Sequence, residues 1–322
     1  MHQGKVRHGI LKGLVALAAL LVTGSAAFAQ DLLTLAIGQR GVWETSVSEI
    51  GQDAGIFKKH GLKLELLYTQ GTGETQQAVI SGSADLGMSV GTFGALGAFA
   101  KGAPVRVIGT TMTGGNDLIW YVAGDSPIKT LKDTAGKTVA YSTNGSSSHQ
   151  TVLAFAKHFN VALRPTATGG PPSTLTQVMS GQVDVGWLAL PFGIDAYDQG
   201  RIRFIAKASD VPHLRDQTIR VMVANANAFA KRRDVFVRYL RAYRDTLEWM
   251  YSDPAAITAF AKWAKISEAV GKRVYDMSPR EDLNPDRLSG LDGVMSDAVT
   301  FKHITAPLTA EQTKELFQIP LK

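Results

Sequence analysis

The stretch MSGQVDVGWLA at residues 179–189 repeats, with substitutions, the stretch ISGSADLGMSV at residues 80–90. Each has an apolar residue before Ser-Gly, and each then places Asp, an aliphatic residue and Gly at the same spacing. The two aspartates, Asp85 and Asp184, are 99 residues apart. A phrase repeated at this distance predicts a structural unit of small-domain size that occurs twice.

The similarity continues on both sides of the two stretches. Strand-like runs at 32–40 and 137–145 break into polar loops, and each precedes a segment with apolar residues at helical spacing. Further strands are predicted within the quoted stretches and at 62–69, 161–168, 102–110 and 200–208. Strand and helix therefore alternate twice in the order β-α-β-α-β-α-β, which predicts mainly parallel sheets flanked by helices.

Two α/β lobes of this kind predict a ligand cleft between them, because ligands of open parallel sheets bind beyond the carboxyl ends of the strands. The loops at those ends are rich in Gly, Ser and Thr, and such small residues let backbone N–H groups approach a ligand. A role in tight turns alone would explain these glycines in one lobe, but it explains their double occurrence less well. The predicted cleft loops are 39–46, 70–74, 88–93, 142–148, 169–173 and 187–192.

The C-terminal third of the chain does not repeat. Residues 217–229 are typical of a strand that leaves the second lobe, and apolar residues from Phe236 to Met250 recur at helical spacing. We expect the tail to return to the first lobe and complete it. The predicted division is residues 31–118 plus 222–322 for lobe one and residues 119–221 for lobe two.

Residues 1–29 have the pattern of a secretory signal peptide. Three basic residues precede an apolar run that is shorter than the roughly 20 residues of a membrane anchor, and Ala27-Phe28-Ala29 follows it. We expect cleavage near Ala29 and a soluble, periplasmic monomer. The chain has no cysteine, which excludes disulfides and cysteine-based metal or thiol sites. Its formal charge of +6, part of which belongs to the signal, does not indicate a nucleic-acid partner.

The segment STNGSSSHQ at 142–150 lies where a predicted strand ends and a helix begins. First-turn N–H groups have no partner within a helix, and the helix dipole adds partial positive charge there. With Gly145 and the hydroxyls of Ser146, Ser147 and Ser148, this turn can bind an anion without a cationic side chain. In the alternative interpretation, one serine caps the helix and the others face water.

His149 follows these serines but does not predict a hydrolase. Neighbouring residues at a helix start point in different directions, and the chain has no G-x-S-x-G elbow. The histidines also lack the H-E-x-x-H spacing or a comparable metal-binding pair. The sequence therefore predicts no catalytic residue, no cofactor and no metal site.

Trp43 and Trp187 lie in predicted cleft loops of opposite lobes. Their rings can enclose the body of a ligand as the lobes close, and core packing is the alternative for each. Thr72 and Gly73 open the helix that follows the second strand of lobe one. The candidate ligand-binding residues are Gln39, Trp43, Thr72, Gly73, Ser89, Gly91, Thr92, Gly145, Ser146, Ser147, Ser148 and Trp187.

Three segments, at 126–153, 71–90 and 179–191, resemble periplasmic substrate-binding proteins of ABC importers for nitrate, taurine and aliphatic sulfonates. Gly-Ser-Ser-Ser-His after a strand is the most specific of these similarities. The resemblance implies the two-lobed type II binding-protein fold and delivery of a small molecule to an inner-membrane permease. Leu190-Pro191 stands where sulfonate-binding members tend to carry Asp-Pro, so a less polar, aromatic ligand body becomes an alternative.

A related enzyme, a synthase of a pyrimidine precursor, is the main rival. That family relies on a cysteine-rich iron motif, which a chain without cysteine lacks. The effector lobe of a transcription regulator would need a helix-turn-helix domain in front, and residues 1–30 are too few for one. We therefore predict a non-enzymatic binding component of an importer for a small organic anion. A pyrimidine or another neutral heterocycle is the alternative ligand.

Overall fold

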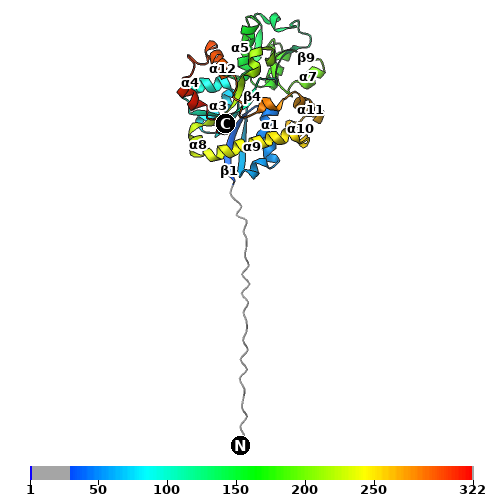
Figure 1. Cartoon of the computed structure of the whole chain (residues 1–322). Coiled ribbons are helices and arrows are strands. Elements are labelled where there is room, and N and C mark those ends of the chain that lie inside the picture. Colours follow the sequence, from blue (N-terminus) through cyan, green and yellow to red (C-terminus); the bar gives the residue numbers. More distant parts are fainter. Residues whose placement is uncertain (2–29, 321–322) are drawn as a thin grey trace.

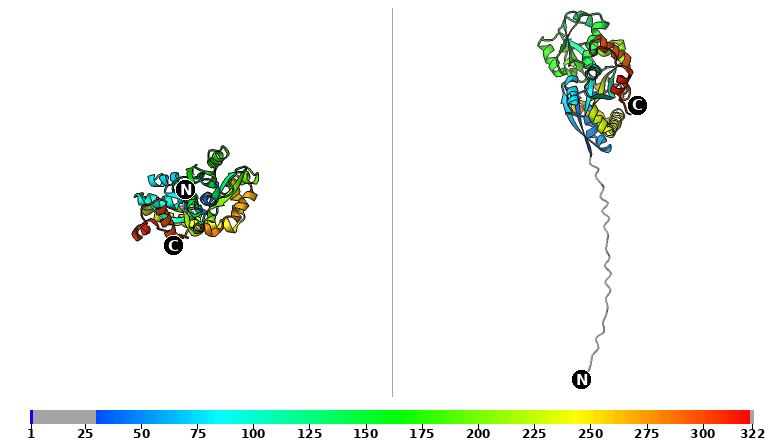
Figure 2. Two further views of the ribbon diagram at one scale, coloured as in Figure 1. Left: turned by 90° about the horizontal axis from the view of Figure 1, so that it is seen from above. Right: turned by 90° about the vertical axis from the view of Figure 1, so that its left-hand side faces the viewer.

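The structure is a computed structural model, and it describes residue 1 and residues 30–320. Two lobes of strands and helices lie next to one another (Figures 1 and 2). The predicted signal peptide lies outside the described residues. Within residues 30–320, no helix is long and apolar enough to cross a membrane.

Lobe one is built on a five-stranded sheet in the order β2-β1-β3-β10-β4. Its members are β1 (Asp31–Gly38), β2 (Leu62–Thr69), β3 (Leu86–Gly91), β4 (Val105–Thr113) and β10 (Thr218–Asn225). β1 pairs in parallel with β2 and β3, whereas β10 is antiparallel to β3 and β4. Four strands therefore share one direction, and the strand that arrives from the other lobe opposes them.

Lobe two has the same arrangement in two bonded groups. Its strands are β5 (Leu118–Ala123), β6 (Thr138–Tyr141), β7 (Arg164–Ala167), β8 (Gly186–Ala189) and β9 (Ile202–Lys207). β5 is antiparallel to β8 and β9, and β6 is parallel to β7. A parallel bridge between Val139 and Val185 joins the groups, which gives the order β7-β6-β8-β5-β9.

The antiparallel strands β5 and β10 are also the two crossovers between the lobes. β5 follows β4 of lobe one, and β10 follows β9 of lobe two. This topology confirms the predicted α/β fold with two lobes, each a mainly parallel sheet flanked by helices. The lobe boundaries at 118/119 and 221/222 stay a prediction.

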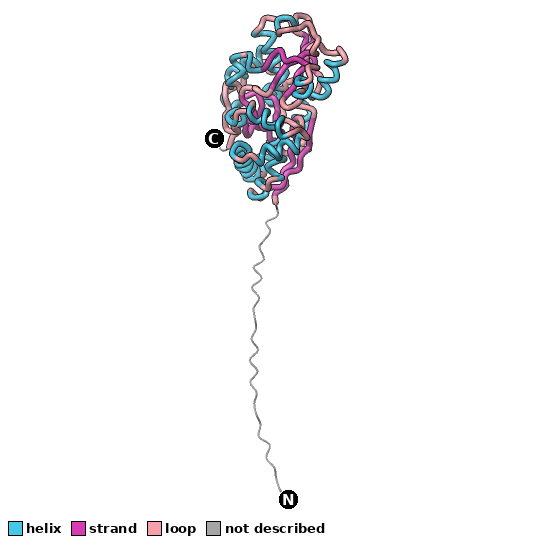
Figure 3. Tube along the Cα trace, turned by 90° about the vertical axis from the view of Figure 1, so that its right-hand side faces the viewer, coloured by secondary structure: helices cyan, strands magenta, loops and turns pink. Residues whose placement is uncertain are grey.

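Helices surround both sheets (Figure 3). Lobe one carries α1 (Trp43–Asp53), α2 (Ile56–Lys59), α3 (Thr72–Ser81) and α4 (Thr92–Ala100), and lobe two carries α5 (Ser147–His158), α6 (Pro171–Met179) and α7 (Ile194–Asp198). The C-terminal region adds α8 (Ala226–Lys231), α9 (Arg233–Ser252), α10 (Ala255–Ala264), α11 (Glu268–Asp276), α12 (Leu291–Thr300) and α13 (Ala310–Leu316). The helical segment predicted after the first strand forms two helices, α1 and α2, because Gly55 between them is left-handed, with φ of 77°.

The repeated aspartates make equivalent hydrogen bonds in the two lobes. Asp85 accepts from the backbone N–H of Thr34 at 3.1 Å, and Asp184 accepts from that of Thr138 at 2.9 Å. Each bond ties the start of the third strand to the start of the first strand beside it. The repeated sequence motif therefore holds the first and third strands side by side in each lobe.

The C-terminal region packs on the core and sheet of lobe one. The buried face of α9 includes Phe236, Leu240 and Tyr243, which belong to the main hydrophobic core. Farther along the chain, α13 packs on β4, and Gln318 donates its backbone N–H to the Val107 carbonyl at 2.8 Å. The C-terminal segment thus packs on lobe one, and it also reaches lobe two through ion pairs such as Arg273 with Asp198 and Asp297 with Lys157.

Candidate functional site

A pocket lies between the lobes, where loops from both sheets meet. Its cavity volume is about 30 Å³, which is room for roughly two water molecules. Seven of the predicted residues line it: Gln39, Thr72, Ser89, Ser146, Ser147, Ser148 and Trp187. Glu44, Thr45 and Ser142 also line it; they lie in predicted cleft loops but were not among the candidate residues. Arg220 lines it as well and lies in none of the predicted loops.

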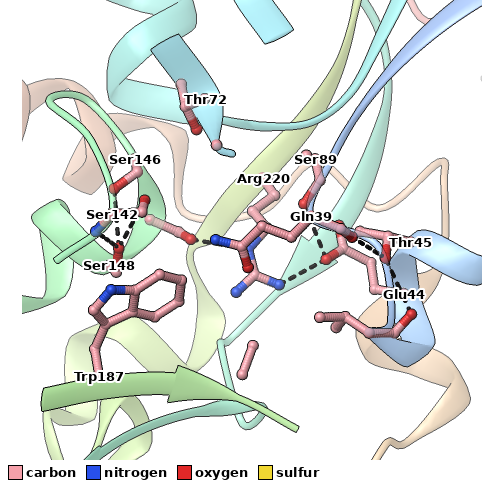
Figure 4. A pocket seen from close by; sticks show the side chains of 15 residues that line it. Gln39, Glu44, Thr45, Thr72, Ser89, Ser142, Ser146, Ser148, Trp187 and Arg220 are labelled. Atoms are coloured by element: carbon pink, nitrogen blue, oxygen red, sulfur yellow. Dashed lines mark hydrogen bonds and ion pairs between the residues drawn. The ribbon is translucent and has the colours of Figure 1, made fainter. Parts of the chain in front are cut away.

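The serine turn at the start of α5 forms one wall of the pocket (Figure 4). The Ser146 hydroxyl accepts from the His149 N–H at 3.1 Å and therefore caps the helix. The Ser148 oxygen accepts from the Ser142 N–H at 2.9 Å and lies 3.0 Å from the Ser146 hydroxyl. Ser146 and Ser148 thus organise the turn itself, whereas the Ser147 hydroxyl faces across to the other lobe.

Arg220, on the crossover strand β10, adds a cationic side chain beside the serine turn, which on the sequence alone can bind an anion without one. Its buried guanidinium points toward Glu44 of lobe one (Figure 4) and also contacts Ser147 of lobe two. Nε donates to the Ser147 hydroxyl at 2.9 Å, and Nη1 donates to Glu44 Oε2 at 2.7 Å. Burial opposes the charge of Arg220, but Asp117 and Glu44 outweigh burial and raise its pKa above the usual value.

Asp117 and Glu44 share this single guanidinium. Asp117 binds it through both oxygens, with Oδ2 at 2.8 Å from Nη1 and Oδ1 at 3.3 Å from Nη2. Glu44 is 4% exposed, and its Oε2 also accepts from the Ser89 hydroxyl at 3.1 Å. Burial raises the pKa of Glu44; Arg220 works against that rise and Asp117 adds to it. Glu44 Oε1 and Thr111 Oγ1 are both buried without a hydrogen bond of normal geometry among the described residues, and the Thr111 hydroxyl acts to lower the pKa of Glu44.

Gly91 and Gly145 provide close contact between the lobes rather than pocket wall. The Gly94 N–H donates to the Gly145 carbonyl at 3.0 Å, and the Gly73 N–H donates to the Thr143 hydroxyl at 3.2 Å. A Cβ on Gly91 would lie 2.7 Å from Ser146 Cα and still closer to the Gly145 oxygen. Glycine is required here because two backbones touch.

Two further predicted residues have structural bonds. The Thr92 hydroxyl is buried and donates to the Thr218 carbonyl at 2.7 Å, away from the pocket. Thr72 lines the pocket and accepts the Gly91 N–H at 3.0 Å. Gln39 and Ser89 line the pocket in the left-handed backbone region, with φ of 61° and 60°. Such strain in residues other than glycine is concentrated at functional sites.

The two tryptophans have different positions. Trp187 lines the pocket, and its Nε1 donates to the Gly169 carbonyl at 3.2 Å, which fixes the ring. Trp43 is 2% exposed in the hydrophobic core. Its Nε1 donates to the Tyr251 hydroxyl at 3.0 Å, and its ring packs edge-on against Phe260. The expectation that Trp43 faces the ligand is therefore corrected, because the start of α1 turns its ring into the core.

The His149 ring contacts Gly145 and Tyr141. Its Nδ1 accepts the Gly145 N–H at 3.2 Å, and its ring stacks on Tyr141 with the centroids 4.1 Å apart. Burial first, and His303 of lobe one second, lower the pKa of His149 to about 4. A neutral ring whose acceptor is already bonded is not placed as the base of a serine nucleophile. No cluster of three or more His, Cys, Asp or Glu suitable for a metal occurs within residues 30–320.

Solved structures with the same fold include several binding proteins. The alkanesulfonate-binding protein SsuA from Xanthomonas axonopodis pv. citri, bound to MOPS, has a TM-score of 0.72 and 18% identity over 85% of this chain and 92% of that one. The aliphatic sulphonate binding protein SsuA from Escherichia coli has a TM-score of 0.70 and 20% identity over 89% and 92%. The nitrate-binding protein NrtA from Synechocystis PCC 6803 has a TM-score of 0.67 and 11% identity over 88% and 84%.

A curated relative is an enzyme. The 4-amino-5-hydroxymethyl-2-methylpyrimidine phosphate synthase of Uromyces fabae is 22% identical over 237 residues, which are 69% of this chain and 67% of the synthase. The family described as NMT1/THI5 like matches residues 49–257 of this chain, which run from within α1 to within α10. This span includes both crossovers and most of the pocket. The chain therefore belongs to the NMT1/THI5-like family.

Proposed function

We propose that this chain is the substrate-binding component of an ABC importer, and that it binds a small organic anion between its lobes and delivers it to an inner-membrane permease. The observation that carries this proposal is the pocket in which donors from both lobes converge. The Arg220 guanidinium, the Ser147 hydroxyl and the first-turn N–H groups of α5 all lie at its wall. Donors held in this way suit oxygen atoms of an anion.

The fold supports a cycle of opening and closing. Ser147 and Gly145 of lobe two contact Arg220 and Gly94 of lobe one, so a ligand that bridges the same surfaces favours the closed form. The closed pocket has room for roughly two waters, and a ligand larger than a simple oxyanion therefore requires wider lobe separation. Capture and release by lobe movement need no chemical step, in keeping with a binding protein.

A neutral heterocycle such as a pyrimidine is the second candidate ligand. The unpartnered Oε1 of Glu44 can accept from a ring N–H, and Trp187 offers an aromatic wall. The similarity to a pyrimidine phosphate synthase agrees with this candidate but is weak, at 22% identity.

A thermal-shift screen tests the proposal with protein that begins at Gln30. Sulfonates, inorganic oxyanions, carboxylates and pyrimidines are added singly. A ligand at 100 times its Kd stabilises the folded state by about 2.7 kcal/mol, which raises Tm by roughly 5–10 °C in a protein of this size. We expect anions to stabilise the wild-type protein and not the Ser147→Ala variant. Stabilisation by neutral heterocycles alone would contradict the anionic ligand.

The periplasmic location has a separate test. We expect protein recovered from the exported fraction of an expressing bacterium to begin near Gln30, because Ala27-Phe28-Ala29 fits a signal cleavage site. Intact mass spectrometry measures this directly. A mature mass that retains residues 1–29 would contradict export by a cleaved signal.

A further inference from the structure

The buried cluster of Arg220, Glu44 and Asp117 beside the pocket contains more negative charge than positive charge. Among the described residues that line the pocket, Arg220 carries the only positive charge and Glu44 the only negative one. Asp117 adds a second carboxylate directly behind, where it binds the guanidinium through both oxygens. Two acids therefore share one base in a site that is almost closed to water.

Glu44 is the surplus acid of this cluster. Arg220 and Ser89 both donate to Oε2, whereas Oε1 is buried without a hydrogen bond of normal geometry, as is the Thr111 hydroxyl that also acts on the Glu44 carboxyl. A buried carboxyl oxygen without a partner is costly, so it gains from a hydrogen bond with whatever enters the pocket. With Oε2 already an acceptor of two bonds, Oε1 is the oxygen free to carry a proton.

Arg220 compensates Glu44 and Asp117 together, so one positive charge faces two carboxylates. Besides Arg220 and Asp117, the titratable group that faces it is the Tyr243 hydroxyl of α9, whose own pKa burial raises well above the usual value. This phenol stays neutral at physiological pH. The charged side chains on α2, β2 and α10, which pack against α1, are on the exposed surface: Lys58, Lys59, Lys63, Glu65 and Lys262. On α9, which also packs against α1, the half-buried Arg238 and Arg244 pair with Asp31 and Asp286, and the other charged side chains are exposed: Arg233, Asp234, Arg241, Asp245 and Glu248.

An anion bound at the serine turn would add a third negative charge to this cluster. We propose that the ligand anion enters together with one proton, which the acid form of the buffer in solution supplies, and that Glu44 Oε1 holds this proton. The carboxylate becomes a neutral acid, and its new O–H donates to the ligand or to an acceptor of a residue that lines the pocket. No bond to the ligand forms or breaks. Glu44 is thus a specificity-determining residue that adapts the pocket to negative charge, and this inference rests on the proposed anionic ligand.

The expected signature is pH-dependent affinity with a defined sign. A group that binds a proton on ligand binding makes the complex weaker as pH rises, by up to tenfold per pH unit for one proton. His149 and His303 act in the opposite direction, because their neutral forms suit the closed interface and protonation at low pH opposes closure. The two effects are therefore separable by sign.

Titration calorimetry with ethanesulfonate and with nitrate, from pH 5 to pH 9, tests the proposal. Both probes stay ionised throughout, so they do not titrate themselves. The buffers are Bis-Tris and Tris, which are cationic and cannot compete for the site. The difference in heat between buffers of unequal ionisation enthalpy gives the number of protons taken up. We expect uptake approaching one proton and a Kd that rises close to tenfold per pH unit over part of this range.

Glu44→Gln is the diagnostic variant, because its amide imitates the neutral acid and cannot titrate. We expect it to bind the probes without proton uptake and with a flat pH profile on the alkaline side. Glu65→Gln, on the exposed face of β2, is the matched control and should keep the wild-type profile. The proton count on the wild-type protein tests the proposal even if the buried substitution prevents folding.

The outcomes separate this inference from the proposed function. Tight binding of either anion with no proton uptake at any pH overturns the role of Glu44 and leaves the anion-binding function standing. Absence of binding by wild type and Glu44→Gln at every pH contradicts the anionic ligand and overturns both. Proton uptake that persists unchanged in Glu44→Gln assigns the proton to another group and also overturns the inference.

Discussion

Replacing Gly91 by Ala tests whether tight lobe closure is necessary for binding. The φ of Gly91, −58°, suits alanine, so the fold of lobe one should tolerate the change. The new Cβ, however, would lie 2.7 Å from Ser146 Cα of lobe two, where real Cβ contacts essentially never fall below 3.0 Å. The lobes must therefore separate slightly at this point, which stretches the hydrogen bonds beside it.

Two bonds cross the interface close to this contact. They are the 3.0 Å bond from the Gly94 N–H to Gly145 and the 2.9 Å bond from Arg220 Nε to Ser147. A neutral bond contributes about 0.5–1.5 kcal/mol, and one to a charged group contributes about 1.5–3 kcal/mol. Loss of both from the closed form weakens ligand binding by roughly 2–4 kcal/mol, or about 30-fold to 1,000-fold.

Calorimetry on the best ligand from the thermal-shift screen measures this loss, and Tm without ligand checks that folding is intact. Gly73→Ala is the matched control, because its Cβ would meet the nearest atom of the other lobe, in Thr143, at 3.8 Å. We expect this control to bind like wild type. Wild-type affinity in Gly91→Ala would refute the reasoning that the closed interface of this structure is the ligand-bound one.

Three further predictions concern the serine turn, the tryptophans and pH. Ser147→Ala removes the acceptor of the Arg220 Nε proton and should weaken anion binding roughly tenfold to a hundredfold by calorimetry; unchanged affinity would place the anion elsewhere. Trp187→Phe should lose the ligand-induced change in tryptophan fluorescence, whereas Trp43→Phe should keep it and lose about 1–3 kcal/mol of stability in urea, since only its core contacts change. The pKa of His149 is about 4 in the folded protein and 6.5 in the unfolded chain, so its contribution to stability is complete above about pH 6.5 and is lost as pH falls toward 4. His149→Gln should therefore reduce the pH dependence of the free energy of unfolding in urea between these pH values. An unchanged pH dependence in this variant would assign the effect to other groups.

The sequence by itself determined the repeated architecture. The phrases around Asp85 and Asp184 predict strand, helix and strand in the same order in each lobe, and both aspartates tie neighbouring strands as this repetition requires. The serine turn could also be predicted from the sequence, since the Ser146 side chain that caps α5 bonds to His149, only three residues away. Local hydrogen bonds and hydrophobic periodicity act between residues close in the chain, and such patterns can be read directly.

Only the tertiary structure decided the charge of the pocket. Arg220 is separated by 73 residues from Ser147, by 103 from Asp117 and by 176 from Glu44, and the strand that carries it crosses between the lobes. Within that strand its neighbours are apolar, so no local pattern distinguishes it from a surface arginine. Trp43 and Trp187 likewise occupy similar predicted loops, yet one ring turns into the core and the other lines the pocket. Burial and pairing of such side chains depend on which distant segments fold against them, and that is a property of the closed lobes rather than of any single stretch.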